Sequence, residues 1–211
     1  MSDPKVIFLD WNKTLSNSLF WSHMHPDNGH DYSLYHGKLI STLFVENKKL
    51  INPWMRGEYS TDDIMQILSP LVGLSTEVLK EELAISCSNQ SFVDSFIPEY
   101  IKSIKNKGIK VVIATDNMDT FRKYTVPSMK LEELFDDFLI SCELGVLKDD
   151  HGDESIPFFD DYLKHNNLKY QDSVLLDDCI DKTGVYDNLG LKIRQVTSPN
   201  VFINMLKEYA N

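Results

Sequence analysis

Acidic and hydroxyl side chains stand directly after short hydrophobic runs at three places in the sequence. The residues in these positions are Asp10, Thr115, Asp177 and Asp178. A carboxylate can attack a phosphoester and become an aspartyl-phosphate, which splits one difficult reaction into two easier steps. Because two anions meet in that attack, the site also needs positive charge, and Mg²⁺ held by a few carboxylates supplies it. These residues therefore suggest a phosphoryl-transfer site with Asp10 as its nucleophile.

Each of these residues also has a simpler interpretation. Asp or Thr at the end of a strand is most often a helix N-cap or a turn residue. Lys148, taken alone, is an ordinary solvent-exposed lysine. Asp181 has the position of a residue that complements a helix dipole near the helix N-terminus, rather than that of a metal ligand. Only the complete set of residues favours chemistry over capping.

The hydrophobic runs that precede these residues are short and rich in Val, Ile, Leu and Phe. Such runs are typical of strands buried on both faces, as in a parallel sheet covered by helices. The expected strands occupy 6–9, 111–114, 138–140, 174–176 and, with a weaker pattern, 191–196. Ligands bind such sheets outside the carboxyl ends of the strands, so the polar residues are expected to meet there.

Helical patterns alternate with the expected strands. Apolar residues recur at intervals of three and four over 97–104 and over 156–163. Gly108 is well placed to end the first of these helices. The alternation of strands and helices predicts an α/β fold with a doubly wound parallel sheet.

Residues 16–94 interrupt this alternation. They contain no convincing strand pattern, but apolar residues such as Ile64, Ile67 and Leu68 recur at helical spacing. We therefore expect a smaller all-helical domain at 16–94, inserted after the first strand and positioned over the site. The core domain is expected to consist of 1–15 and 95–211.

Four segments resemble, in the right order, the motifs of the haloacid dehalogenase-like (HAD) superfamily. They are Val6-Ile-Phe-Leu-Asp10-Trp-Asn-Lys-Thr14-Leu15, Val111-Val-Ile-Ala-Thr115-Asp-Asn117, Glu143-Leu-Gly-Val-Leu-Lys148, and Val174-Leu-Leu-Asp177-Asp178-Cys-Ile-Asp181 with Gly190-Leu191 downstream. A looser match is similar to a segment of many helical caps in this superfamily. It is Met55-Arg-Gly-Glu-Tyr-Ser-Thr-Asp-Asp-Ile64.

The resemblance implies a Rossmann-like core with a helical cap, and a Mg²⁺-dependent phosphatase acting on a small phosphorylated metabolite. Asp10 is then the nucleophile. The expected Mg²⁺ ligands are Asp10, Asp178 and the main-chain carbonyl of Asn12, and Asp177 would support the metal. Lys148 would keep Asp10 ionised and neutralise the transferring oxygens.

The resemblance also implies a set of phosphate contacts. The Thr115 hydroxyl and the backbone at Asp116 and Asn117 would donate to the remaining phosphate oxygens. From the cap, Arg56 is a candidate contact for an anionic substrate, although a helix-start role near Gly57 explains it equally well.

Position 12 departs from the family pattern. The family places a general acid/base Asp two residues after the nucleophile, whereas this chain has Asn12. An amide cannot shuttle a proton near neutral pH, and general acid–base catalysis is worth roughly 10²–10⁴-fold. We therefore expect slow hydrolysis of alkyl phosphates, or a preference for acyl and anhydride phosphates. Asp116 or a cap histidine is a candidate substitute for the missing acid.

Other functions stay open at this point. A phosphotransferase or mutase would pass the phosphoryl group from Asp10 to another hydroxyl. A weakly active or non-catalytic relative would only bind phosphate or a protein partner, and Asn12 is the feature in its favour. A dehalogenase is disfavoured because it requires neither a metal nor the Asp177-Asp178 pair. Phosphonate cleavage is disfavoured because that branch has Ala at the position of Asn12.

Composition narrows the choice of partners and location. The net charge of −11 argues against non-specific nucleic-acid binding. No stretch approaches the ~18 apolar residues of a membrane span, and the first residues do not resemble a signal peptide. Three scattered cysteines form no disulfide framework. We expect a cytoplasmic protein; the sequence gives no indication of its oligomeric state.

Four histidines in the predicted cap raise the question of a zinc site. They are His23, His25, His30 and His36. The spacing of two between the first pair suits a strand or loop better than one helical face. Because no Cys or Glu lies nearby in a known ligand pattern, substrate contact or surface exposure is the favoured interpretation.

Overall fold

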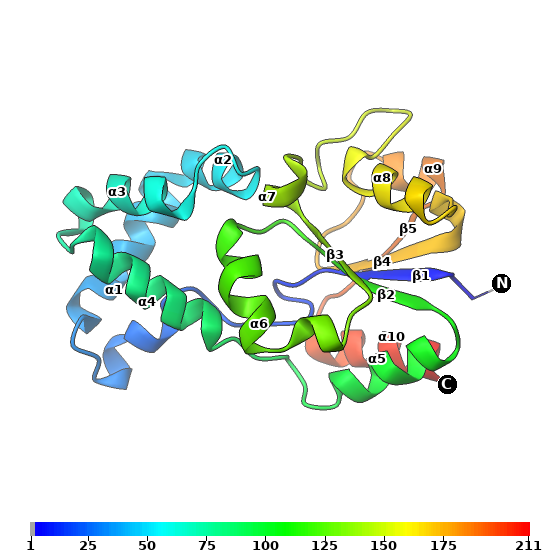
Figure 1. Cartoon of the computed structure of the whole chain (residues 1–211), viewed down its shortest axis with the longest axis horizontal. Helices are drawn as coiled ribbons and strands as arrows, with labels where there is room; N and C mark the ends of the chain where they lie inside the picture. Colours follow the sequence, from blue (N-terminus) through cyan, green and yellow to red (C-terminus); the bar gives the residue numbers. More distant parts are fainter. Residues whose placement is uncertain (1–2) are drawn as a thin grey trace.

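The computed structural model describes residues 3–211, which form a sheet-containing part and a helical part (Figure 1). Residues 1 and 2, at the start of the predicted core segment 1–15, lie outside the described residues. The sheet has five parallel strands in the order β3-β2-β1-β4-β5. They are β1 (Val6–Leu9), β2 (Lys110–Thr115), β3 (Asp137–Ile140), β4 (Ser173–Asp177) and β5 (Lys192–Gln195). Every hydrophobic run that predicted a strand therefore forms one.

The central strand explains why these runs lack polar residues. All four residues of β1 are buried, and alternate side chains enter different apolar clusters: Ile7 and Leu9 one, Val6 and Phe8 the other. Leu9 pairs with β2 on one side and with β4 on the other. The residues that follow these strands therefore emerge at one edge of the sheet.

Helices cover both faces of the sheet (Figure 1). On one face lie α5 (Ile97–Asn106) and α10 (Pro199–Ala210), and on the other lie α8 (Pro157–His165) and α9 (Val185–Leu189). The apolar residues at helical spacing in 97–104 are buried against the sheet. This is the doubly wound α/β fold that the sequence predicts.

The segment that interrupts the alternation is helical, and no strand occurs in the described residues 16–94. Its helices are α1 (Ser33–Ser41), α2 (Ile51–Met55), α3 (Thr61–Val72) and α4 (Thr76–Ser88). They surround an apolar cluster of their own that includes Trp21, Trp54 and Leu68. The helix α3 begins with a capping box between Ser60 and Asp63. We refer to 16–94 as the helical segment; its status as a separate domain stays a prediction.

Shorter helical turns complete the chain. They are α6 (Val126–Ser128) and α7 (Ser141–Leu144), the 3₁₀ turns Ser22–Met24, Pro26–Asn28, Lys48–Leu50, Leu131–Glu133 and Tyr170–Asp172, and the π turns Thr42–Glu46 and Phe121–Thr125.

The two connections between the helical segment and the sheet lie side by side. The Trp11 indole N–H donates to Gln90 Oε1 at 2.5 Å, and the Val93 N–H donates to the Leu15 carbonyl at 2.9 Å. The Trp11 ring is buried and packs at 5.0 Å from the ring of Phe121. The loop after β1 is therefore fixed both by the core and by the returning chain.

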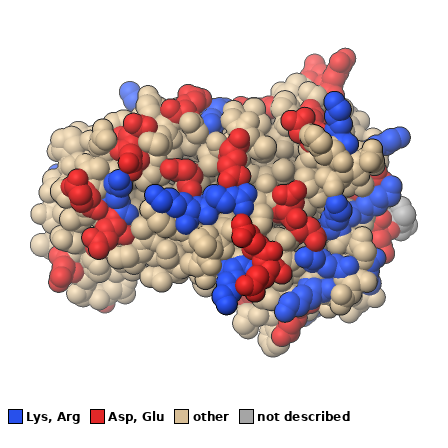
Figure 2. Space-filling view, in the orientation of Figure 1, with Lys and Arg blue, Asp and Glu red and all other residues tan. Residues whose placement is uncertain are grey.

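Figure 2 shows acidic and basic side chains interspersed over the face it presents. Among the described residues, no helix has both the length and the apolar character that a membrane crossing requires.

Candidate active site

Three residues from distant parts of the chain meet at the carboxyl edge of the sheet. Asp10 follows β1, Asp177 ends β4, and Lys148 lies in the loop between α7 and α8. The Lys148 Nζ lies 2.7 Å from Asp10 Oδ1 and 2.5 Å from Asp177 Oδ2. All three side chains are buried. The lysine that sequence spacing selected is thus in contact with the proposed nucleophile.

Burial and charge shift the ionisation of this trio. Burial raises the pKa of Asp10 to about 7; Asp177 and Asp178 add to the increase, while Lys148 opposes it. Burial disfavours the charged form of Lys148, but the surrounding carboxylates raise its pKa overall. For Asp177, burial is outweighed by Lys148 and by the Cys179 N–H, so its pKa is lowered. The surrounding protein therefore compensates a negative charge on Asp10 less well than one on Asp177.

This charge balance fits a divalent cation. The carboxylates of Asp10 and Asp177 contact one buried ammonium group, and the charge of Asp178 also acts on Asp10. The second cation nearby, Lys13, lies 3.4 Å from Asp178 Oδ2 but its side chain is 75% exposed. Hard oxygen donors with excess negative charge are what Mg²⁺ requires. The residues at this site therefore suit a bound Mg²⁺, and the role of each expected ligand stays a prediction.

The backbone after β1 forms a tight loop around Asn12. Lys13 adopts a left-handed conformation with φ of 59°, and its N–H donates to the Ser16 carbonyl at 2.7 Å. The tight loop keeps Asn12 beside Asp10, and both line the same polar cavity.

Asp116 is the best-placed acid near Asn12. Its Oδ1 accepts the Lys148 N–H at 3.0 Å. Burial, more than any neighbouring charge, raises its pKa. A carboxyl group with a raised pKa is better suited to carry a proton near neutral pH. Asp116 therefore remains a candidate for the acid/base role that Asn12 cannot perform.

The residues predicted to contact phosphate differ in whether their hydrogen-bonding groups already have partners. The Thr115 hydroxyl is buried and has no hydrogen-bond partner among the described residues, and Thr115 lines neither of the site's cavities, so its contact with phosphate stays a prediction. By contrast, the Asn117 N–H donates to Ser141 Oγ at 2.9 Å, and Asn117 Oδ1 accepts from the Met118 N–H. The Asn117 backbone thus holds the loop after β2 together.

Arg56 forms an ion pair with Asp150, which follows Lys148 by two residues. Its guanidinium donates to both carboxylate oxygens of Asp150, at 2.7 and 2.5 Å. Asp150 also accepts the Leu147 N–H at 2.8 Å, directly before Lys148. The Arg56 hydrogen bond leads the effects that lower the pKa of Asp150. Arg56 therefore anchors the Lys148 loop and lines neither of the site's cavities.

The neighbouring Gly57 explains the rest of this motif. It has a φ of 72°, and a Cβ at this position would lie 2.5 Å from the Cys142 carbonyl oxygen. Only glycine allows the backbone after α2 to approach α7 this closely. Arg56 and Gly57 thus form part of the contact between the helical segment and the core, which we call the seam.

Asp119 forms a second part of the same seam. Its carboxylate accepts the Trp54 indole N–H at 3.1 Å and the Thr61 hydroxyl at 2.5 Å. Sequence reasoning missed Asp119, and also Tyr186, whose hydroxyl donates to the Lys148 carbonyl at 2.7 Å. Neither has a local signal, because each partner is distant in sequence.

The cap histidines meet a glutamate that the sequence does not place near them. His23 Nε2 lies 2.8 Å and His30 Nε2 3.4 Å from the buried Glu82 Oε2. The backbone N–H of Tyr32 donates to His30 Nδ1, which leaves Nε2 as the nitrogen that carries the proton toward Glu82. This is the pattern of a hydrogen-bonded buried carboxylate.

Asp181 lies near the N-terminus of α9, as the sequence led us to expect. Its carboxylate accepts the N–H groups of Gly184, at 2.7 Å, and of Asp187, at 3.0 Å. It thereby holds the turn that leads into α9.

Two cavities meet at the site. The first, of about 420 Å³, is lined by Asp10, Lys148 and Asp177 together with the loop after β4. The second, of about 380 Å³, lies against the helical segment. Asn12 and Asp116 line both cavities. The two cavities therefore adjoin at Asn12 and Asp116.

No family model and no curated protein sequence matches the chain. Solved structures do match. A predicted HAD-like family hydrolase from Porphyromonas gingivalis superposes with a TM-score of 0.70 at 14% identity, covering 98% of both chains. A HAD family enzyme from Bacteroides thetaiotaomicron, in complex with magnesium and inorganic phosphate, gives a TM-score of 0.65 at 13% identity, covering 92% of this chain and 95% of that one.

Dehalogenases are similar as well. The L-2-haloacid dehalogenase from Xanthobacter autotrophicus gives a TM-score of 0.60 at 12% identity, covering 92% of this chain and 77% of that one. The chain thus has the fold of the HAD-like hydrolases, as its motifs led us to expect. Because the identities are low, this likeness establishes the fold rather than the reaction.

Proposed function

We propose that the protein is a Mg²⁺-dependent phosphatase of small phosphorylated metabolites, with Asp10 as the nucleophile. The observation that carries this proposal is the position of Lys148, whose buried Nζ lies within 2.7 Å of both Asp10 and Asp177. Such a contact orients the nucleophile and provides a positive charge for the oxygens that it must attack. The related enzyme that was crystallised with magnesium and inorganic phosphate agrees with this chemistry.

In the first step, an Asp10 carboxylate oxygen attacks phosphorus and the bond from phosphorus to the leaving oxygen breaks. Lys148 neutralises the transferring oxygens, and the Thr115 hydroxyl donates to one of them. An acyl or anhydride phosphate releases a stable anion that needs no proton. An alkyl phosphate needs one, which protonated Asp116 would give to the leaving oxygen.

In the second step, water attacks phosphorus and the bond to Asp10 breaks, which releases inorganic phosphate. With an alkyl phosphate, Asp116 has lost its proton in the first step, and its carboxylate takes the proton from this water. With an acyl or anhydride phosphate, Asp116 must be ionised from the start to take that proton. Asn12 orients the ligand by hydrogen bonding alone. When bound, Mg²⁺ supplies the charge that lets two anions meet; Asp10, Asp178 and the Asn12 carbonyl would hold it, with Asp177 in support.

The fold also serves dehalogenation, but the charge at this site favours phosphate chemistry. A dehalogenase that uses no metal gains nothing from the pair Asp177-Asp178, whose negative charge adds to that of Asp10. Release of halide from 2-chloropropionate, without release of phosphate from any ester, would identify a dehalogenase instead.

The test is a panel of acetyl phosphate, methyl phosphate, glycerol 3-phosphate, glucose 6-phosphate and benzyl phosphate, with Mg²⁺ or with EDTA. We expect phosphate release that requires Mg²⁺ and is abolished in Asp10→Asn. The matched control is Asp153→Asn, the same change at an exposed acid on a loop of the core, which should leave the rate unchanged.

Two outcomes of this panel would contradict the proposal. If Asp10→Asn keeps the parent rate, Asp10 is not the nucleophile. If the parent releases no phosphate from any compound, the protein is not a phosphatase of this class. Transfer of the phosphoryl group to an added alcohol, without free phosphate, would identify a phosphotransferase.

A further inference from the structure

The second cavity differs in character from the polar one beside Asp10. Apart from a polar end at 12–18 and Asp116, its wall is formed by apolar side chains of the helical segment and by one core residue. The main apolar contributors are Phe20, Ile40, Phe44, Ile51, Met55 and Met118. This wall is far more apolar than recognition of a sugar or a second phosphate would require.

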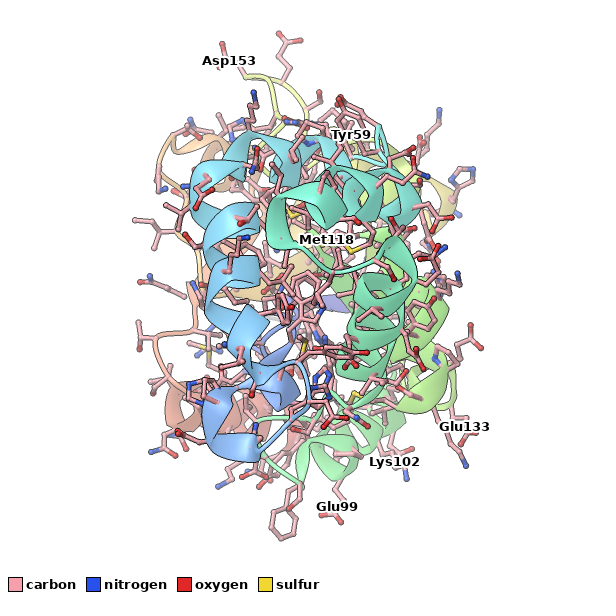
Figure 3. All side chains as sticks on the ribbon, turned by 90° about the vertical axis from the view of Figure 1, so that its left-hand side faces the viewer. Tyr59, Glu99, Lys102, Met118, Glu133 and Asp153 are labelled. Carbon is pink, nitrogen blue, oxygen red and sulfur yellow. The ribbon has the colours of Figure 1, made fainter. Side chains whose placement is uncertain are left out.

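The apolar wall is supported from behind. Five of its side chains belong to the helical segment, are half-buried, and pack against the segment's own apolar cluster. The rings of Phe20 and Phe44 stack at 6.4 Å with an interplanar angle of 19°. Met118, from the loop after β2, is itself buried in that cluster and lies near the middle of Figure 3, which faces the helical segment. The cavity is therefore a preformed recess.

Few charged groups are available inside this recess. Of the described residues that line it, only Lys13 and Asp116 are charged. Lys13 points toward Asp178, and Asp116, whose Oδ1 accepts the backbone N–H of Lys148, stands at the border with the polar cavity. Arg56, the cation expected from the sequence, is held by both oxygens of Asp150. A leaving group rich in hydroxyls or charge would lose water here without gaining partners.

The residues shared by the two cavities indicate which part of a bound substrate would face the recess. A phosphoryl group at Asp10 lies in the polar cavity, and the shared residues Asn12 and Asp116 stand where the bond to the leaving group would be. The remainder of the molecule then extends along the apolar wall.

We infer that the leaving group of the substrate is apolar, an aryl or branched alkyl group of modest size, and that the apolar wall selects it. This inference rests on the proposed phosphatase function. The recess of about 380 Å³ is at the small end of cavities that bind small molecules. In a hydrophobic pocket, a single methylene group is worth about 10–200-fold in specificity.

The test compares kcat/KM for three esters. Benzyl and methyl phosphate release alcohols of similar acidity, so that their difference reports contact with the wall rather than leaving-group chemistry. Glucose 6-phosphate carries a ring of similar size that is polar. We expect kcat/KM for benzyl phosphate to exceed both others by at least about tenfold.

A matched pair of variants locates the effect. Phe44→Ala should lower the benzyl-to-methyl ratio of kcat/KM at least about fivefold, with most of the change in KM for benzyl phosphate. Val45→Ala alters the adjacent residue, which is 72% exposed and lies outside the recess, and should leave that ratio unchanged. Because the readout is a ratio within one preparation, partial unfolding of a variant does not affect it.

The outcomes separate the two proposals. Equal values for the three esters, or a preference for glucose 6-phosphate, would overturn the apolar leaving group while the phosphatase function stands. An unchanged ratio in Phe44→Ala would also overturn the role of the wall. Absence of phosphate release from every ester would overturn the proposed function itself.

Discussion

The chemistry of individual residues at this site depends on how buried charges are balanced. Lys148 is buried among carboxylates, where an ammonium group is retained only because Asp10 and Asp177 lie within 2.7 Å. Removing one member of such a buried set leaves uncompensated charge and is strongly destabilising. Burial of this charged set costs stability, and it places a cation where a bound anion would need one.

Asp10 gives a pH dependence with a defined sign. Its pKa in the folded protein is about 7, above the ordinary 3.8, so the metal-free folded state binds the proton more tightly than the unfolded state does. Its contribution to stability is fully present below pH 4 and is lost as the pH rises through about 7. The loss is on the order of a few kcal/mol, because one pKa unit corresponds to about 1.4 kcal/mol.

Denaturant unfolding in EDTA, from pH 4 to pH 8, measures this dependence. Asp10→Asn is the reference, since its amide does not titrate. The free energy of unfolding of the parent minus that of the variant should fall across the range, and Mg²⁺ should restore part of it above pH 7. A difference that is constant with pH would show that Asp10 is ionised in the folded protein throughout.

Asn12 gives the second prediction at this scale. Asn12→Asp places a proton carrier beside the nucleophile, so turnover of methyl phosphate should rise by one order of magnitude or more, within the roughly 10²–10⁴-fold range of acid–base catalysis. Acetyl phosphate, whose leaving group needs no proton, serves as the internal control and should change much less. An equal change for both compounds, or a loss for methyl phosphate, would mean that no acid is missing.

At the scale of elements, the loop between α7 and α8 determines where Lys148 lies. It has no regular structure around Lys148. Asp150 and Asp116 accept backbone N–H groups of this loop, and the Tyr186 hydroxyl donates to the Lys148 carbonyl. Asp150 is in turn held by Arg56 from the end of α2. An element of the helical segment therefore helps to set the position of Lys148, although Arg56 lines neither cavity.

Arg56→Gln tests this positioning. The Arg56–Asp150 pair is partly exposed, so its loss should lower the free energy of unfolding by no more than about 1 kcal/mol. We expect kcat to fall by about tenfold or more, because small displacements of a catalytic group are costly. Lys80→Gln, which breaks the exposed pair with Asp62 inside the helical segment, should change neither quantity. A normal kcat in Arg56→Gln would show that Lys148 keeps its position without this pair.

At the scale of the whole molecule, two apolar cores meet along a narrow seam. The sheet and its helices form one part, the helical segment has its own cluster, and Figure 1 shows them side by side. The seam consists of Asp119 with Trp54 and Thr61, Arg56 with Asp150, and the close approach of Gly57 to α7. The recess depends on this contact, since it has walls from each part.

Gly57→Ala should disturb the seam. The added Cβ would meet the Cys142 carbonyl oxygen at 2.5 Å, and the positive φ adds strain, so we expect destabilisation of about 1–3 kcal/mol. Gly29→Ala is the matched control: it also has a positive φ, of 66°, but no atom within 4 Å of the added Cβ. Thermal or denaturant unfolding compares the two. Equal losses would mean that backbone strain alone, rather than the approach to α7, accounts for the effect.

The sequence by itself determined the strands, their order along the chain, the helical character of 16–94, and the polar residues at the strand ends. These features depend on local periodicity and on the rule that parallel strands present their carboxyl ends at one edge. Local pattern also singled out Asp10 and Asp177, whereas Lys148 was selected only through the resemblance to the family motifs.

Only the tertiary structure decided which partners those residues meet. It paired Arg56 with Asp150, brought Glu82 to His23 and His30, and left the Thr115 hydroxyl without a partner. The apolar recess arises from side chains on several elements that look like ordinary core residues in the sequence. Contacts between residues far apart in the sequence, such as Asp10 and Lys148 at 138 positions, follow from packing, and no local pattern encodes them.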